Sequence, residues 1–179
     1  CVTLSDTEMA EYRRFQGTAK ERFVYFFGKL ACKDAVRIYC RDHHDERLFP
    51  ADIDLEQDAA GRQRAKHRDR TRQDALPAVA WAQLEGRFAG VAADVSALGL
   101  ALGKVSAEES DADVARPTAL EAAARMLGLP ANERDSLGIS GEIALPGEVR
   151  VTLAGGPDSG VCVRLARDEQ YVIATALGG

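Results

Sequence analysis

The chain has 179 residues, of which 28% are charged and 46% are hydrophobic, and a formal net charge of −5. This length allows one domain or two small lobes that share an interface, and the composition is typical of a globular protein. No apolar run approaches the roughly twenty residues that are needed to cross a bilayer. We therefore expect a cytoplasmic protein without a membrane partner. The four cysteines lack C-x-x-C spacing, which argues against a zinc site and a disulfide framework: Cys1, Cys32, Cys40 and Cys162.

Two helices are predicted for the first part of the chain. Ser5 has the form of an N-cap, with Glu8 three residues later, and predicts a short helix that ends near Phe15. A long amphipathic helix is predicted from about Thr18 to about Asp42, because apolar side chains return at spacings of three and four. Its predicted apolar stripe contains Phe23, Phe26, Phe27, Leu30 and Ile38, and Cys32 and Cys40 are expected to be small core residues.

Two cations stand at the end of this apolar stripe, Lys33 and Arg37. They could form a phosphate-facing edge, or this could be an ordinary core helix whose charged end meets solvent. The adjacent residues His43 and His44 point in different directions on a helix, so they make a poor metal pair.

A strand and a basic segment follow the long helix. Apolar and acidic residues alternate from Ala51 to Glu56, which predicts a half-buried strand. The loop that we predict next could attract an anionic partner or be a mobile, solvated segment. Nucleic acid is not expected, because no aromatic residues are interleaved with its cations. This basic loop spans 62–72 and contains Arg62, Arg64, Lys66, Arg68, Arg70 and Arg72.

Strands dominate the rest of the predicted structure. Residues 79–85 and 87–93 are predicted to form a hairpin with Glu85-Gly86 as its turn, and a third strand spans about 98–102. The acidic segment 106–115 is predicted to be a loop. A helix is predicted from Thr118 to Leu127, with Pro117 just inside its start and Gly128 as the C-cap. The last part is predicted to be a β-meander of residues 149–153, 161–165 and 171–175, with a turn-rich connector at 155–160.

The order of helix then strands occurs twice along the chain. It predicts two α+β lobes packed side by side. The first lobe would contain residues 1–76, including the basic loop, and the second lobe would contain residues 77–179.

Two segments resemble a known family. The sequences FFGKLACKDAVR, from Phe26 to Arg37, and FPADIDLEQDAAGR, from Phe49 to Arg62, resemble the first lobe of 4'-phosphopantetheinyl transferases, especially those fused to or encoded with bacterial polyketide synthases. The resemblance is strong over about 4–62, moderate over 79–103 and weak afterwards. It implies the surfactin-type α+β fold of two pseudo-symmetric lobes, each a long helix packed on a mainly antiparallel sheet. Since the chain begins with Cys1 rather than Met, we expect a domain cut from a larger polyketide synthase.

The chemistry of this family depends on Mg²⁺, which carboxylates hold while phosphopantetheine passes from coenzyme A to a serine of a carrier protein. The resemblance places the metal strand at 98–103, where Ala101 and Gly103 replace the aspartate and glutamate of the family. The later helix motif falls on 117–123, with Leu120 in place of lysine and Glu121 as the one retained carboxylate. Asp94 is the nearest other carboxylate, in a predicted turn, and a lone carboxylate does not build a Mg²⁺ site. We therefore expect no bound metal and no bound cofactor.

The residues that the resemblance assigns to coenzyme A binding match the family better than those that it assigns to the metal. Arg62 matches the basic residue of a glycine-containing turn, Arg22 lies near a nucleotide-contacting arginine, and Gln83 takes the place of a histidine that helps to hold coenzyme A. Three functions remain open. The first is a catalytically degenerate domain that is a structural or docking part of a polyketide synthase, with acyl carrier protein and neighbouring synthase domains as partners. The second is an active transferase with rearranged carboxylates that uses Mg²⁺ and coenzyme A, and the third is a module that binds coenzyme A or a carrier protein without turnover.

Overall fold

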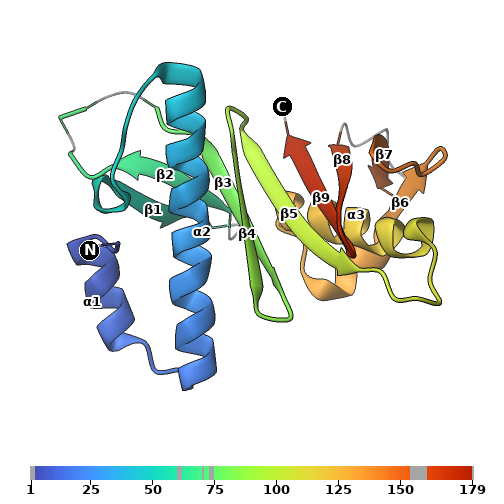
Figure 1. Cartoon of the computed structure of the whole chain (residues 1–179), viewed down its shortest axis with the longest axis horizontal. Coiled ribbons are helices and arrows are strands. Elements are labelled where there is room, and N and C mark those ends of the chain that lie inside the picture. The colour runs from blue at the N-terminus through green and yellow to red at the C-terminus, as the bar shows by residue number, and fades with distance from the viewer. Residues whose placement is uncertain (1–2, 60–61, 70, 73–74, 154–160, 179) are drawn as a thin grey trace. The chain divides into compact units, whose positions relative to one another are not determined.

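A computed structural model describes residues 3–59, 62–69, 71–72, 75–153 and 161–178. The chain divides into two compact units, residues 1–58 with 63–94 and residues 59–62 with 95–179. Each unit contains one long helix and one antiparallel sheet, which confirms the predicted α+β class and the repeated order of helix then strands (Figure 1). The boundary after Asp94 corrects the predicted division after residue 76, because the hairpin of residues 78–93 extends the sheet of the first unit.

The first unit begins with helix α1 (Asp6–Arg14) and the long helix α2 (Ala19–His44). Each helix starts at a capping box, Ser5 with Glu8 and Thr18 with Glu21, in which side chains satisfy the first backbone N–H groups. The short 3-10 helix η1 (Pro50–Asp52) then leads into a four-stranded sheet. Its strands lie in chain order: β1 (Ile53–Gln57), β2 (Gln63–His67), β3 (Ala78–Leu84) and β4 (Arg87–Ala93).

The predicted basic loop is wrong over residues 63–67, which form β2. Ala65 and His67 are buried, whereas Arg64 and Lys66 face solvent, so the segment has the two-residue period of a half-buried strand. The high density of charge obscured that period in the sequence. Lys66 lies 2.5 Å from a carboxylate oxygen of Glu56 on the neighbouring strand. Arg70, also predicted in this loop, lies outside the described residues.

The buried face of α2 differs from the predicted stripe. Phe23 and Ile38 are 47% and 51% exposed, and the helix instead buries Cys32, Val36 and Cys40. Both cysteines are therefore core residues, as predicted, and burial raises the pKa of the Cys32 thiol to about 12.

Two glycines explain why this face of α2 is buried. A Cβ on Gly28 of α2 would lie 2.6 Å from the ring of Trp81 on β3, and a Cβ on Gly90 of β4 would overlap the carbonyl oxygen of Ala31. The backbone of α2 therefore approaches the sheet at positions where no side chain fits.

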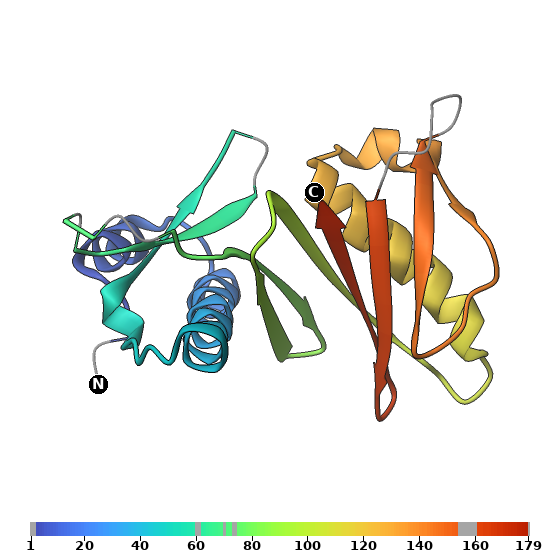
Figure 2. The same cartoon turned by 90° about the horizontal axis from the view of Figure 1, so that it is seen from above.

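The second unit has one helix on one face of a five-stranded antiparallel sheet, as Figure 2 shows. The spatial order is β5-β9-β8-β7-β6, which confirms the predicted meander of the last three strands and adds β6, which was not predicted. The connector predicted at 155–160 lies outside the described residues. The elements are β5 (Ala97–Lys104), α3 (Asp111–Leu127), the 3-10 helix η2 (Ala131–Ser136), β6 (Leu137–Ser140), β7 (Gly147–Leu153), β8 (Val161–Asp168) and β9 (Tyr171–Gly178).

Helix α3 begins seven residues before the predicted helix, so the loop prediction for 106–115 is wrong from Asp111 onward. Ser110 is the N-cap and forms a capping box with Asp113. Acidic side chains stabilise the first turn of a helix, so the composition that suggested a loop belongs to a helix start. Pro117 lies inside α3 rather than at its start, and lacks the N–H that would otherwise reach the carbonyl of Asp113.

No helix in the described part of the chain is both long enough and apolar enough to cross a membrane.

Candidate functional site

The strand that the resemblance assigns to metal binding turns small residues toward α3. Gly99, Ala101 and Gly103 lie on one face of β5, because side chains alternate along a strand. A Cβ on Gly99 would overlap the carbonyl oxygen of Ala122, and a Cβ on Gly103 would overlap the hydroxyl of Thr118. Ala101, between them, is 2% exposed and belongs to the core of the second unit. Contact between strand and helix therefore fills the positions where the family would carry carboxylates.

Glu121 lies on α3, and two arginines hold its carboxylate. Arg125 Nε donates to Glu121 Oε1 at 2.7 Å, and Arg134 donates to Oε2. Arg125 also donates to the carbonyl of Leu100 at 3.0 Å, so this network joins α3, η2 and β5. Leu120 is half-buried against the core of the second unit. In the described part of the chain, no three His, Cys, Asp or Glu side chains gather in a way that could hold a metal ion.

Sequence reasoning missed a buried ion pair in the first unit. Lys33 of α2 is fully buried, and its ammonium group donates to the carboxylate of Glu8 on α1. It also donates to the carbonyls of Thr3 at 3.1 Å and Pro50 at 2.9 Å. Burial lowers the pKa of Lys33, and the hydrogen bond with Glu8 opposes this effect. Both earlier alternatives are therefore wrong for Lys33, which is neither a phosphate-facing cation nor part of a solvated helix end. Arg37, whose side chain is 42% exposed and pairs with Asp34, does meet solvent.

A signal for this pair is present in the sequence. Lys33 follows Cys32 and precedes Val36 by three residues, so it belongs to the buried face of α2. A lysine on such a face needs an acidic partner, because an unpaired buried charge is too costly. The chain position of that partner could not be predicted, since Glu8 was already explained as half of a capping box.

A second lysine extends the cluster. Lys29 Nζ lies 3.0 Å from Glu11 Oε2, 3.8 Å from Glu8 Oε1 and 5.1 Å from the centre of the Tyr25 ring. The hydroxyl of Tyr25 donates to the same Glu11 oxygen at 2.7 Å. Burial and the neighbouring Glu11 carboxylate raise the pKa of Tyr25. This tyrosine therefore stays protonated and acts as a hydrogen-bond donor.

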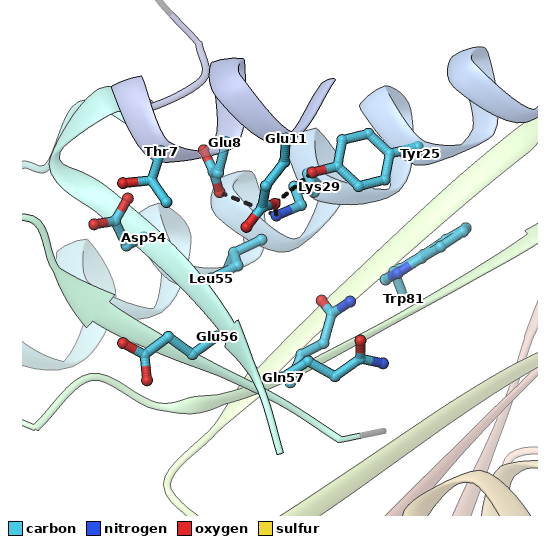
Figure 3. Close-up of a pocket in the computed structure, with 11 residues that line it drawn as sticks. Thr7, Glu8, Glu11, Tyr25, Lys29, Asp54, Leu55, Glu56, Gln57 and Trp81 are labelled. Atoms are coloured by element: carbon cyan, nitrogen blue, oxygen red, sulfur yellow. Dashed lines mark hydrogen bonds and ion pairs between the residues drawn. The ribbon is translucent and has the colours of Figure 1, made fainter. Parts of the chain in front are cut away.

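These side chains border a groove of about 550 Å³, which we call the acidic groove (Figure 3). One side comes from α1 and α2, and the other comes from four consecutive residues of β1. Four carboxylates lie in its lining, and three of them form ion pairs with lysines: Glu8 with Lys33, Glu11 with Lys29 and Glu56 with Lys66. Asp54 therefore leaves the groove with a small net negative charge. The lining residues are Thr7, Glu8, Glu11, Tyr25, Lys29, Asp54, Leu55, Glu56, Gln57, Gln63 and Trp81.

The three residues assigned to coenzyme A lie on separate elements, and none of them lines the acidic groove. Arg22 is exposed in the first turn of α2. Gln83 lies near the end of β3, opposite Phe88 of β4, and Arg62 is half-buried directly before β2. Asp94 follows β4 in the first unit, whereas Glu121 belongs to the second unit.

No family model matches this chain, and no curated protein matches it. The likeness to phosphopantetheinyl transferases therefore depends on the two quoted segments and on the residues aligned with them.

Proposed function

We propose that this chain is a phosphopantetheinyl-transferase-like domain without the metal chemistry of the family, and that it acts as a structural or docking part of a polyketide synthase. The observation that carries the proposal is the face of β5 that lies against α3. Ala101 is buried there, and Gly103 has no space for a side chain, so neither position accepts a metal-binding carboxylate. Mg²⁺ needs several oxygen ligands in near-octahedral geometry, and Glu121 is bound to two arginines.

The other two functions fit the side chains less well. An active transferase would need Mg²⁺ and coenzyme A, and would have to release Glu121 from Arg125 and Arg134. A module that binds coenzyme A would need a cationic pocket for the phosphates. The acidic groove has a small net negative charge, and its lysine is paired with Glu11, so it does not suit them.

The docking surface that we favour is the solvent face of β2 and the residue that follows this strand. Arg64, Lys66 and Arg68 are exposed there and are spaced two residues apart. Carrier proteins are usually acidic, and complementary charge speeds their encounter with a basic surface. Lys66 already pairs with Glu56, and Arg68 pairs with Asp6. A docked acidic partner would therefore have to compete with these intramolecular carboxylates.

We expect the triple variant Arg64→Ser/Lys66→Ser/Arg68→Ser to weaken binding to the parent synthase's carrier protein by about tenfold, and to reduce its salt dependence. Binding should weaken because the variant loses three positive charges that attract an acidic partner. The salt dependence should fall because salt screens the attraction between such exposed charges, with a Debye length of about 8 Å at 0.15 M. Isothermal titration calorimetry at low and high salt measures both effects.

A matched control removes the same charge from the second unit. Arg116, Arg150 and Arg164 are exposed, and their replacement by serine should leave the affinity unchanged. Equal affinities of the two triple variants would remove the β2 surface from the proposal. If the wild-type chain binds neither the carrier protein nor the adjacent synthase domains, the docking role is wrong.

A further inference from the structure

The acidic groove lies along the outer edge of a sheet. β1 is the first strand of its sheet and pairs only with β2 in the described part of the chain. Ala65, directly opposite Leu55, donates its N–H to the carbonyl of Pro77 and therefore turns its backbone away from β1. In an antiparallel pair, the backbone groups of two such opposed residues both point away from each other. The N–H and C=O of Leu55 thus point outward, toward the open edge.

A second hydrogen bond agrees with this direction. Arg68 donates its N–H to the carbonyl of Asp52, so the backbone at position 52 points toward the strand that contains β2. Because the direction alternates along a strand, position 54 points inward and position 55 points outward. An outward edge of this kind is a template for pairing with another extended chain.

The groove has room beside that edge. Its lining includes the consecutive residues Asp54 to Gln57 on one side and Thr7, Glu8 and Glu11 of α1 on the other. Four strand residues span about 13 Å at 3.3 Å per residue, so about four or five residues of an extended peptide would fit along β1.

The charge of the groove indicates what such a peptide should carry. Glu8 Oε1 and Asp54 Oδ1 are buried, and neither accepts a hydrogen bond within the described residues. Lys29, at 3.8 Å from Glu8 Oε1, is beyond hydrogen-bond distance. Figure 3 shows Asp54 of β1 near Thr7 of α1, at the end of the groove where Glu8 also lies. Buried polar atoms are nearly always hydrogen-bonded, so these two oxygens are suited to accept hydrogen bonds from a ligand.

We propose that the acidic groove binds an extended segment of a partner protein, which adds as a strand to β1 and places a lysine or arginine side chain near Glu8 and Asp54. Backbone hydrogen bonds to Leu55 would supply affinity, and the carboxylates would select the basic side chain. The proposal does not depend on the proposed function, because all of its residues lie in the first unit and none of them belongs to β5.

The probe is the peptide acetyl-Thr-Val-Lys-Val-Thr-amide, added to the ¹⁵N-labelled chain and followed by NMR. We expect saturable binding, with at least about tenfold slower hydrogen exchange of the Leu55 amide, because that N–H gains a strand partner. The same peptide with glutamate in place of lysine should bind at least about tenfold more weakly, because it brings a like charge to the groove. n-Butylamine, which carries the cation without a backbone, should also bind at least about tenfold more weakly.

Two variants test whether the peptide binds in the groove or elsewhere on the first unit. Asp54→Asn should weaken binding of the lysine peptide by about tenfold, because a charge-assisted hydrogen bond is lost. Asp45→Asn removes the same charge from an exposed helix C-cap outside the groove and should have no effect. Tryptophan fluorescence of Trp81 checks that both variants are folded.

Three results would overturn the proposal. The first is equal binding of the lysine and glutamate peptides, and the second is equal binding of the lysine peptide and n-butylamine. The third is an unchanged exchange rate at Leu55 when the lysine peptide is present at millimolar concentration, whether or not the peptide binds elsewhere.

Discussion

We expect Glu8→Gln to lower the free energy of unfolding of the first unit by about 3–5 kcal/mol, because it leaves a buried ammonium group without a negative partner. Lys33 is fully buried, and Glu8, its carboxylate partner, is 2% exposed. Urea unfolding followed by tryptophan fluorescence measures the effect. The single tryptophan of the chain, Trp81, lies on β3, so its signal reports on the first unit.

Two further variants test this explanation. Glu11→Gln removes the partner of Lys29 at a site where the Glu11 side chain is 53% exposed. It should therefore cost less than about 1 kcal/mol. The double variant Glu8→Gln/Lys33→Met should recover most of the stability, because an apolar side chain of similar length needs no charged partner. A loss in Glu8→Gln no larger than the loss in Glu11→Gln would show that the buried pair is not a main stabilising contact.

The loss of stability in Glu8→Gln should depend on pH. Burial holds the pKa of Lys33 below its ordinary value in the folded chain. Between the lowered folded value and the unfolded value of about 10.4, the unfolded chain binds more protons, so stability rises with pH. Glu8→Gln removes the group that opposes this lowering, and the window becomes wider. The stability deficit of Glu8→Gln should therefore shrink as pH rises toward 10, in urea unfolding at several pH values.

We expect Ala101→Asp to destabilise the second unit by about 3 kcal/mol or more, because it places a carboxylate in a core without a partner. Ala101 is 2% exposed on the face of β5 that contacts α3. Hydrogen exchange followed by mass spectrometry should show about a hundredfold loss of protection in α3 and β9, since each 1.4 kcal/mol corresponds to a factor of ten.

Glu121→Gln is the control for this variant, since it changes a carboxylate on the same unit at a side chain that is 27% exposed. Its effect should stay near 1 kcal/mol, as for other partly exposed ion pairs. If Ala101→Asp is as stable as the wild type, then the face of β5 has space for a carboxylate and does not exclude a metal ligand there.

Local signals predicted much of the fold. The capping box of Ser5 and Glu8 placed the start of α1, and alternation of apolar and polar residues placed β1. The hairpin of β3 and β4 was predicted from Glu85-Gly86, and both residues have the positive φ that such a turn requires. These signals succeed because each depends on residues close together in the chain.

The features that the sequence did not predict depend on contacts between residues far apart in the chain. The pattern of α2 places Lys33 on its buried face, but no local signal identifies Glu8 and the two carbonyls that surround it. Ala101 and Gly103 looked like substituted motif positions, whereas their packing against the core and α3 gives them a structural role. The acidic groove joins α1, α2 and β1, so its lining could be recognised only after these elements were placed together.

Intact-protein mass spectrometry of an apo carrier protein is the most direct test of a domain without transferase chemistry. The carrier protein would be incubated with the chain, coenzyme A and Mg²⁺, and a surfactin-type transferase in a parallel reaction would show that the carrier can be modified. We predict no gain of a phosphopantetheine group with this chain and complete conversion with the control enzyme. A gain of one phosphopantetheine group that depends on both Mg²⁺ and the chain would contradict the proposed function.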